Sequence, residues 1–453
     1  MRAKKFCAVL AVSLASQFSF CPVSGAETIQ DAIQKMIDTH PDVRSAIHNR
    51  LARDQEVRQA RSGYFPTVDF EAGAGRNYVD KPFDSDLDPR LLRLGLRQNI
   101  FAGLSTKNEI ERQKARVESQ AYLIRSTADN MALRVADVYL DVLKYQAIND
   151  LAQENLLLHQ RIADQVQLRS ASGVDSRADM DQIRSRLSLA HAGVVVSEQN
   201  LLDAQTAYNA VVGNLPEKLQ RPADMSKLLP PTMAKAEELA LASHPQLKSA
   251  QADLQARRAQ EEVAKSPFMP VVDFEADQVF EEDTSYNSNY DGYEREDLRL
   301  FLRLRYNLFN GWKDEARKTE TMHLVNEAQE IRNHTHRQVV ESTRLSWRAH
   351  EAAQKQINYL AQRLEFAANT ADAYTLQWNI GQRTLLDVLD AEAERIDSAR
   401  QLVTAEYDGL YAQCRILNST GQLIPALQMQ WPTESTTADG NNAAVMPAAS
   451  KKS

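Results

Sequence analysis

The feature that most constrains the fold is an internal duplication. His40-Pro41 returns as His244-Pro245, and the pentapeptide VDFEA at 68–72 returns at 272–276, both 204 positions later. Further along the chain the spacing becomes 208, and it is kept by three pairs of glycines: Gly103 and Gly311, Gly173 and Gly381, Gly213 and Gly421. Because the spacing is held over so long a stretch, we expect both halves to contain the same elements in the same order.

Two very long intervals contain neither glycine nor proline, one between Gly103 and Gly173 and one between Gly311 and Gly381. In the first interval, apolar residues recur at alternating steps of four and three, as in the seam of a coiled coil. These seam residues are Val117, Ala121, Ile124, Ala128, Met131, Val135, Val138, Val142, Tyr145, Ala152, Leu156, Ala163 and Val166. Each interval predicts a helix of roughly 100 Å that reverses at its final glycine. Such a rod is also typical of a purely structural coiled coil.

Before each long interval lie two amphipathic strands. Their even-numbered residues are mostly apolar and their odd-numbered residues mostly charged, so each hairpin has one apolar and one charged face. We expect the charged residues to line an aqueous lumen: Asp69, Glu71, Arg93, Arg97, Asp273, Glu275, Arg299 and Arg303. Strands of about ten residues suit a tilted bilayer crossing, although a hairpin packed on a soluble core has the same pattern. A barrel needs about eight strands, so several copies of the chain would have to combine.

Composition and motifs exclude several classes of protein. The formal net charge is −8, and removal of a basic leader makes the remaining chain more acidic still, which argues against a nucleic-acid partner. Cys414 is then the only cysteine, so no disulfide can form within the chain. The nine histidines are scattered, and no nucleophile elbow, phosphate-binding loop or Cys/His cluster is present. We therefore expect no enzyme activity, no cofactor and no metal site.

The two halves together resemble the TolC-like outer-membrane efflux and type I secretion channels. The motifs that carry the resemblance are YNLFNG at 306–311 and GQRTLLDVLDA at 381–391. The resemblance implies an α+β membrane protein that forms a homotrimer, with a twelve-stranded β-barrel continued by a coiled-coil α-barrel. It also implies a tunnel that tapers to a closed periplasmic mouth, where the turns at Gly173, Val174, Gly381 and Gln382 contact an adaptor protein.

The repeat and the resemblance together divide the chain into five parts. We expect a signal peptide at 1–26, a first repeat at 27–212, an equatorial linker at 213–232, a second repeat at 233–421, and an equatorial segment with a disordered tail at 422–453. The expected hairpins are 66–101 and 270–309, and the expected long helices are 103–172, 175–212, 312–380 and 382–418. Each repeat begins with one shorter helix, 28–62 or 234–265, with His-Pro inside its first part.

Five residues near the second glycine turn are candidates for function. Asp387 and Asp390 are three residues apart and therefore share one helix face. In the family the matching pair lines the tunnel at its narrowest point, where threefold symmetry would create a cation-selective ring; a solvated acidic face is the plain alternative. By resemblance, Arg383, Asp179 and Trp378 hold the periplasmic gate closed, although Trp378 stands where the family usually has a phenol.

We expect an outer-membrane channel-tunnel that exports proteins or small toxic compounds, with type I secretion favoured by the resemblance. The expected partners are a periplasmic adaptor, an inner-membrane transporter of the ABC or RND type, and outer-membrane lipid. The alternative is a non-conducting periplasmic coiled-coil scaffold tethered to the outer membrane. The even and odd strand pattern favours the channel over the scaffold.

Overall fold

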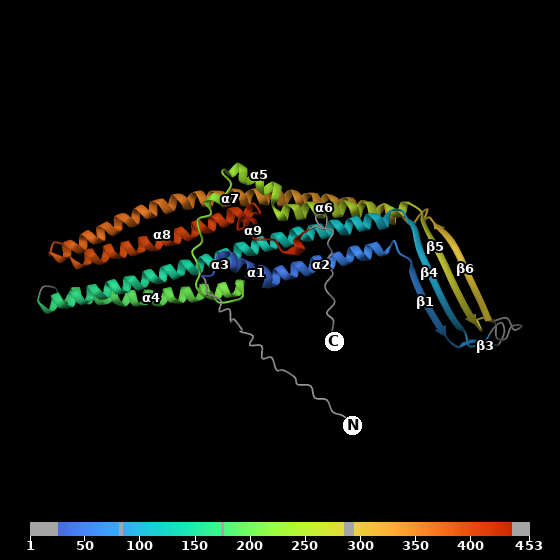
Figure 1. Ribbon diagram of the computed structural model, residues 1–453, viewed down its shortest axis with the longest axis horizontal. Helices are drawn as coiled ribbons and strands as arrows, with labels where there is room; N and C mark the ends of the chain where they lie inside the picture. Colours follow the sequence, from blue (N-terminus) through green and yellow to red (C-terminus); the bar gives the residue numbers. More distant parts are fainter. Residues whose placement is uncertain (1–25, 81–84, 174–175, 285–293, 437–453) are drawn as a thin grey trace, which may run out of the picture.

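The computed structural model describes residues 26–80, 85–173, 176–284 and 294–436. The expected leader (apart from Ala26), the last residues of the expected tail, and Val174 lie outside these ranges. The described elements are drawn out along one axis, with the four long strands at one end and two helical turns at the other (Figure 1). In the described ranges, every helix lacks an apolar stretch long enough to cross a membrane.

The two expected rods are present, and each contains 67 residues: α3 (Ser105–Ala171) and α7 (Lys313–Asn379). They are followed by the returning helices α4 (Arg177–Val212) and α8 (Leu385–Ser419). Most of the predicted seam of α3 is buried, including Ala121 and Val135, so the predicted coiled-coil pattern does mark the packed face. All six glycines of the repeat have positive φ, which explains why both repeats keep glycine at these turns.

The expectation of one short helix at the start of each repeat was wrong. The structure has two instead, α1 (Ile29–Thr39) and α2 (Pro41–Ser62), and likewise α5 (Met233–Ser243) and α6 (Pro245–Ala264). A proline ring disfavours helical backbone in the residue before it, so the helix ends at the histidine and restarts at the proline. His40 caps the new helix, because its Nδ1 accepts the backbone N–H of Asp42 at 3.2 Å.

The two predicted hairpins join into one antiparallel sheet, in the order β1 (Thr67–Ala74), β4 (Arg90–Ala102), β5 (Val271–Glu282), β6 (Glu294–Arg305). A small second pair, β2 (Asn77–Val79) with β3 (Ser85–Leu87), lies at the tip of the first hairpin. Strands β4 and β5 bring the two repeats together, with Leu96 opposite Ala276. Within the single chain, β1 and β6 are the two edges of this sheet.

The register places most of the large apolar residues of the four strands on one face, whereas Phe301 lies opposite Glu275 on the other. Phe70 lies opposite Leu94, and Phe274 lies opposite Leu302. This face is not covered by other elements: Phe70 is 71% exposed and Leu302 is 70% exposed. The alternative in which the hairpins pack on a soluble core is therefore wrong for the single chain.

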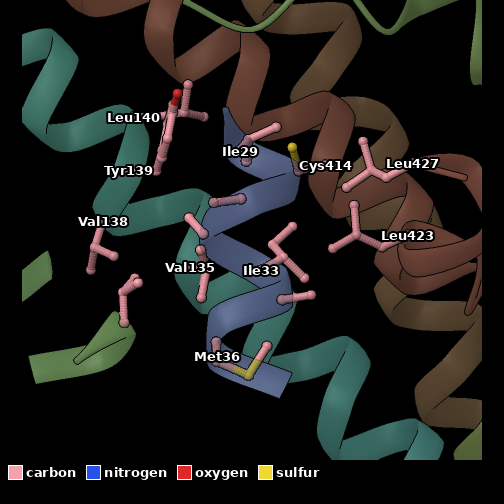
Figure 2. Close-up of a cluster of buried hydrophobic side chains, with 14 of the residues drawn as sticks. Ile29, Ile33, Met36, Val135, Val138, Tyr139, Leu140, Cys414, Leu423 and Leu427 are labelled. Atoms are coloured by element: carbon pink, nitrogen blue, oxygen red, sulfur yellow. The ribbon is translucent and has the colours of Figure 1, made fainter. Parts of the chain in front are cut away.

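The main hydrophobic core, drawn close up in Figure 2, lies midway along the rods, where Figure 1 shows α1 and α9 (Leu423–Ala426). There Ile33 and Met36 of α1 pack against Val135 of α3, close to Cys414 of α8 and Leu423 of α9. Three short 3-10 helices complete the fold: η1 (Ser226–Leu228), η2 (Ser266–Phe268) and η3 (Thr433–Ser435). This core holds the start of the chain and the segment after α8 against the long helices.

Candidate functional site

The ends of the two helical hairpins lie side by side at the end of the molecule opposite the strands (Figure 1). Gly173 and Gly381 form the two turns with φ of +78° and +80°. At the second turn, the N–H of Gln382 donates to the carbonyl of Gln377 at 2.9 Å, which closes the end of α7. A Cβ placed at either glycine would meet nothing within 4 Å, so these turns need glycine for its backbone freedom alone.

The two repeat-related aspartates, Asp179 and Asp387, both cap helices. Asp387 is the third residue of α8, and its Oδ2 accepts the N–H of Thr384 at 3.1 Å and the hydroxyl of Thr384 at 2.8 Å. Asp179 does the same for Ser176 at the start of α4, at 3.0 and 2.7 Å. The two hydrogen bonds from Thr384, first that of its hydroxyl and then that of its backbone N–H, lower the pKa of Asp387. The carboxylate of Asp387 therefore stays charged in neutral solution.

Arg383 contacts residues of its own hairpin. Its Nε donates to Gln377 Oε1 at 3.1 Å, its Nη1 lies 3.8 Å from Asp387 Oδ1, and its guanidinium carbon lies 4.3 Å from the ring centre of Tyr374. None of these contacts is with Asp179, the other charged gate candidate. Arg383 is held beside Asp387 instead.

Trp378 is a packing residue in the single chain. It is 3% exposed and belongs to a small hydrophobic group that we call the tip cluster: Ile162, Val166, Ile183, Trp378, Leu385, Val388 and Leu389. Because these residues come from α3, α4, α7 and α8, the cluster joins both hairpins near their turns. The guanidinium carbon of Arg169 lies 4.9 Å from the centre of the Trp378 ring. The indole thus fills the cluster, while Asp179 is occupied with its helix cap.

Asp390 forms an ion pair between the hairpins. Its Oδ1 lies 2.7 Å from Nη2 of Arg186 on α4, and both side chains remain partly exposed. The two predicted ring residues therefore differ: Asp387 caps its own helix with Arg383 of the same hairpin 3.8 Å away, and Asp390 pairs with Arg186 of the other hairpin. Any negative ring built from them has part of its charge balanced by Arg186 and Arg383.

Ion pairs connect neighbouring strands on the charged face of the sheet. Arg97 of β4 lies 2.8 Å from Asp273 of β5, which is also bonded to Arg305 of β6. Arg303 lies 2.8 Å from Glu275. Through these pairs, the basic strands β4 and β6 are both joined to the acidic strand β5 between them.

The remaining lumen candidates have neighbours of other kinds. Arg93 pairs with Asp277 at 2.8 Å, whereas Glu71 is 4.0 Å away from it. Arg299 pairs with Asp297 of its own strand at 2.7 Å. Asp69 lies exposed on the edge strand β1.

Sequence reasoning missed the residues that hold these groups in place. Ser176 and Thr384 had a readable signal, because a serine or threonine three residues before an acidic residue is typical of a capping box. Arg186 and Arg169 had no such signal. Their partners lie on the other hairpin, and only the packing of the rods brings them together.

Comparison with known sequences gives consistent matches along the chain. Residues 32–214 and 237–422 match the family described as outer membrane efflux protein, one match for each repeat. The outer membrane efflux protein BepC of Brucella suis biovar 1 is 23% identical over 88% of this chain and 86% of its own length. The outer membrane protein TolC of Escherichia coli K12 is 24% identical, with 89% and 84% covered. The alkaline protease secretion protein AprF of Pseudomonas aeruginosa is 21% identical, with 87% and 85% covered.

Solved structures give the same fold. CusC, described in relation to transmembrane channel formation, superposes with a TM-score of 0.77 at 15% identity and covers 86% of this chain and 91% of its own. The outer membrane protein VceC of Vibrio cholerae superposes with a TM-score of 0.74 at 16% identity, covering 87% and 96%. The arrangement of strands, rods and tips described above is therefore that of outer membrane channel proteins.

Proposed function

The chain belongs to the outer membrane efflux protein family and is located in the outer membrane, extending into the periplasm, and on this premise we propose that three copies join into one export channel. In this assembly the three sheets form a twelve-stranded barrel in the membrane. The helices continue it as a periplasmic tunnel, and the tip turns form its mouth. The general role of the family is efflux and export.

The observation that carries this proposal is the sheet at the end of the rods. Its apolar face is exposed in the single chain, as lipid contact would require. Its two edges, β1 and β6, lack partner strands within the sheet, and an open edge inside a membrane is avoided by closing a barrel. Four strands are too few to close on themselves, so further copies supply the remainder.

The substrate class that we favour is protein, delivered by a type I secretion system. The support is the name of one relative, the alkaline protease secretion protein of Pseudomonas aeruginosa; another relative of that organism is named for pyoverdine export. Deleting the gene and comparing the secreted proteins and the sensitivity to toxic compounds distinguishes the two. Loss of a secreted protein supports type I secretion, and sensitivity alone supports small-molecule efflux.

We propose that the tips of the two helical hairpins contact the partners on the inner-membrane side of the system. The turns at Gly173 and Gly381 are exposed and stand farthest from the sheet, so a periplasmic adaptor bound to an inner-membrane ABC or RND-type transporter would meet them first. Cross-linking in cells from a cysteine at Gln382, in a Cys414→Ala background, tests this. Capture of an adaptor from Gln382→Cys, without capture from the control Gln329→Cys in the first quarter of α7, supports the assignment.

The selective ring follows from threefold symmetry at the tips. Three copies of Asp387 would place negative charge at the mouth. Asp390 would add the part of its negative charge that Arg186 does not balance. Replacing both aspartates by alanine should abolish cation selectivity and block by trivalent cations in planar bilayers. Block that survives the double substitution would rule out this ring.

In the proposed gate, Arg383 and Asp179 form contacts between neighbouring hairpins of the assembled mouth, and the buried side chain of Trp378 packs behind them. In that state Arg383 would exchange its contacts within the hairpin for one with the next hairpin. Arg383→Ser with Asp179→Ala should therefore raise the resting conductance. An unchanged resting conductance would show that these residues do not close the mouth.

The channel and the alternative scaffold separate in a simple fractionation. A channel remains in the outer membrane after high-salt washing and is released by detergent as a trimer. A scaffold held by weak contacts is released by salt. Release by salt would overturn the proposed function.

A further inference from the structure

We propose that a cavity between the two repeats binds a phosphate-type oxyanion from solution. The cavity lies between α3 of the first repeat and α6 of the second, and its volume is about 240 Å³. Pockets for drug-sized molecules are usually larger, whereas this volume is enough for a small anion with several waters. Except for Ala256, every residue that lines the cavity is polar, and three of them are Arg112, Arg116 and Arg257. One chain alone makes this site, so it goes beyond the proposed channel function.

The two helices touch at the end of the cavity that is farther from the sheet. The hydroxyl of Ser119 on α3 donates to the carbonyl oxygen of Ser249 on α6 at 3.0 Å, and the hydroxyl of Ser249 donates to the carbonyl oxygen of Ser119 at 3.0 Å. Nearer the sheet, arginines from both helices enter the same space. Because their like charges repel one another, the guanidinium groups do not close this space.

The two arginines of α3 bond to residues on their own helix or on α2. Arg112 donates from Nε and Nη2 to the carboxylate of Glu109, at 2.8 and 2.6 Å. Arg116 donates from Nη1 to Glu56 of α2 at 3.0 Å and to Gln113 at 3.1 Å. A guanidinium has five N–H donors, so both arginines keep donors for an anion in the cavity.

Positive charge exceeds negative charge around the cavity. On α6, Arg257 Nε lies 4.0 Å from Asp253 Oδ2, and the side chain of Asp253 is 46% exposed. Arg53 of α2 lies 2.6 Å from Glu56 and thus shares this carboxylate with Arg116. In the described part of the chain, these four arginines contact three carboxylates between them, which leaves positive charge for a ligand.

The guanidinium of Arg116 is the group that this imbalance affects most directly. Burial, followed by the positive charge of Arg53, lowers the pKa of Arg116 from its ordinary value, although Glu56 opposes the change. An anion bound beside Arg116 would balance charge that the protein balances only in part.

The second rod has the same length without these arginines. α3 and α7 both contain 67 residues, but at the repeat spacing of 208 the counterparts of Arg112 and Arg116 are Glu320 and Leu324. A rod therefore does not need arginine at these positions in order to form. The arginines of α3 instead serve the cavity.

The chemistry of the lining selects an oxyanion. Guanidinium groups bond to phosphate through pairs of parallel N–H donors, and arginines of both helices line the same cavity. One phosphate would therefore accept hydrogen bonds from α3 and α6 at once. It would hold the two repeats together next to the sheet.

The position along α3 favours an anion from solution over a lipid headgroup. α3 begins at Ser105, so Arg112 and Arg116 lie roughly 10 and 17 Å beyond its start at 1.5 Å per residue. In the proposed channel the sheet crosses the membrane, and each headgroup layer is roughly 5–8 Å thick. Both arginines then lie on the periplasmic side of that layer. Only the choice between these two sources rests on the proposed function.

Phosphate-dependent unfolding of the purified full-length protein tests the site. Inorganic phosphate is added at constant ionic strength, and the midpoint of thermal unfolding should rise with its concentration, because a ligand of the folded state stabilises that state. Arg116→Gln and Arg257→Gln should each weaken the apparent phosphate affinity about tenfold or more, whereas Arg257→Lys, which keeps the charge, should weaken it less. The matched control Arg258→Gln changes the neighbouring exposed arginine of α6 and should respond as the wild type does.

The phosphate dependence separates binding from stability, since a variant that is less stable without phosphate still reports its own affinity. A wild-type midpoint that does not move with phosphate would overturn the proposal. An equal rise in the wild type and in both glutamine variants would also overturn it, because phosphate then acts by general exclusion from the protein surface.

A second arm distinguishes a dissolved anion from a lipid headgroup. The protein is reconstituted into phosphatidylcholine vesicles with or without phosphatidylglycerol, in the absence of phosphate. A rise in the midpoint that needs phosphatidylglycerol and both arginines, with no response to inorganic phosphate, would overturn the dissolved anion in favour of a headgroup. Channel conductance is measured separately, so failure of the anion site leaves the proposed function standing.

Discussion

Asp129 provides a pH-dependent test of how the middle of the molecule is held together. It is 2% exposed on α3, and it accepts the N–H of Ile424 at 3.3 Å and the side-chain amide of Asn418 at 3.1 Å. Burial raises the pKa of Asp129 from its ordinary 3.8 to about 7, although these hydrogen bonds oppose the change. At about 1.4 kcal/mol per pH unit, this difference is worth about 4 kcal/mol.

The direction of the pH dependence of the opening free energy follows from proton binding. Between pH 4 and 7 the packed state keeps a proton on Asp129 that the opened state releases, so the free energy of opening falls as pH rises through this window. It should fall by about 4 kcal/mol in all and stay level above the folded pKa. In Asp129→Asn the dependence disappears. At pH 4, loss of one accepted hydrogen bond makes the variant less stable than the wild type by about 1–3 kcal/mol. Above pH 7 the order is reversed, because the wild type has lost about 4 kcal/mol and the variant has not.

Hydrogen exchange of the amides in α9, corrected for the intrinsic pH dependence of exchange, measures the opening free energy directly. We expect protection to fall from pH 5 to pH 8 in the wild type and in the control Asp150→Asn, which changes an exposed carboxylate of the same helix. Protection in Asp129→Asn should be level. If Asp129→Asn kept the wild-type pH dependence, the assignment of this titration to Asp129 would be wrong.

Three further changes address the tips. Arg186→Gln should increase the preference for cations in bilayer recordings, because it leaves the charge of Asp390 unbalanced. The free energy of unfolding should change by less than about 1 kcal/mol, since the ion pair is exposed. An unchanged preference would show that Asp390 does not face the ion path. Trp378→Ala should destabilise the tip cluster by about 3–5 kcal/mol, seen as faster limited proteolysis at the turns, whereas Trp378→Phe should have a smaller effect. Thr384→Ala removes the cap of α8 and should lower stability by about 1 kcal/mol, measured by thermal unfolding against Thr370→Ala on the exposed face of α7.

Local patterns in the sequence were enough to predict the long elements. The rods follow from glycine-free and proline-free intervals with a coiled-coil spacing, and the strand faces follow from simple alternation. The prediction failed at His40-Pro41 and His244-Pro245, where one helix was expected and two are present. The backbone preference before proline outweighed the continuous helical pattern on either side.

The tip residues were predictable only in part. Asp387 and Asp390 both lie on α8, but their different surroundings depend on Thr384 and Arg186. The first lies three residues away in sequence and could have been recognised as a cap. The second lies 204 residues away, and its contact with Asp390 exists only because the two hairpins meet near their turns.

The central claim is that this chain conducts through the outer membrane, and purified trimers in a planar lipid bilayer test it most directly. We expect stable single-channel currents with a small resting conductance and a preference for cations. We also expect Arg383→Ser with Asp179→Ala to raise this conductance. Trimers that insert into the bilayer without carrying any current would contradict the account.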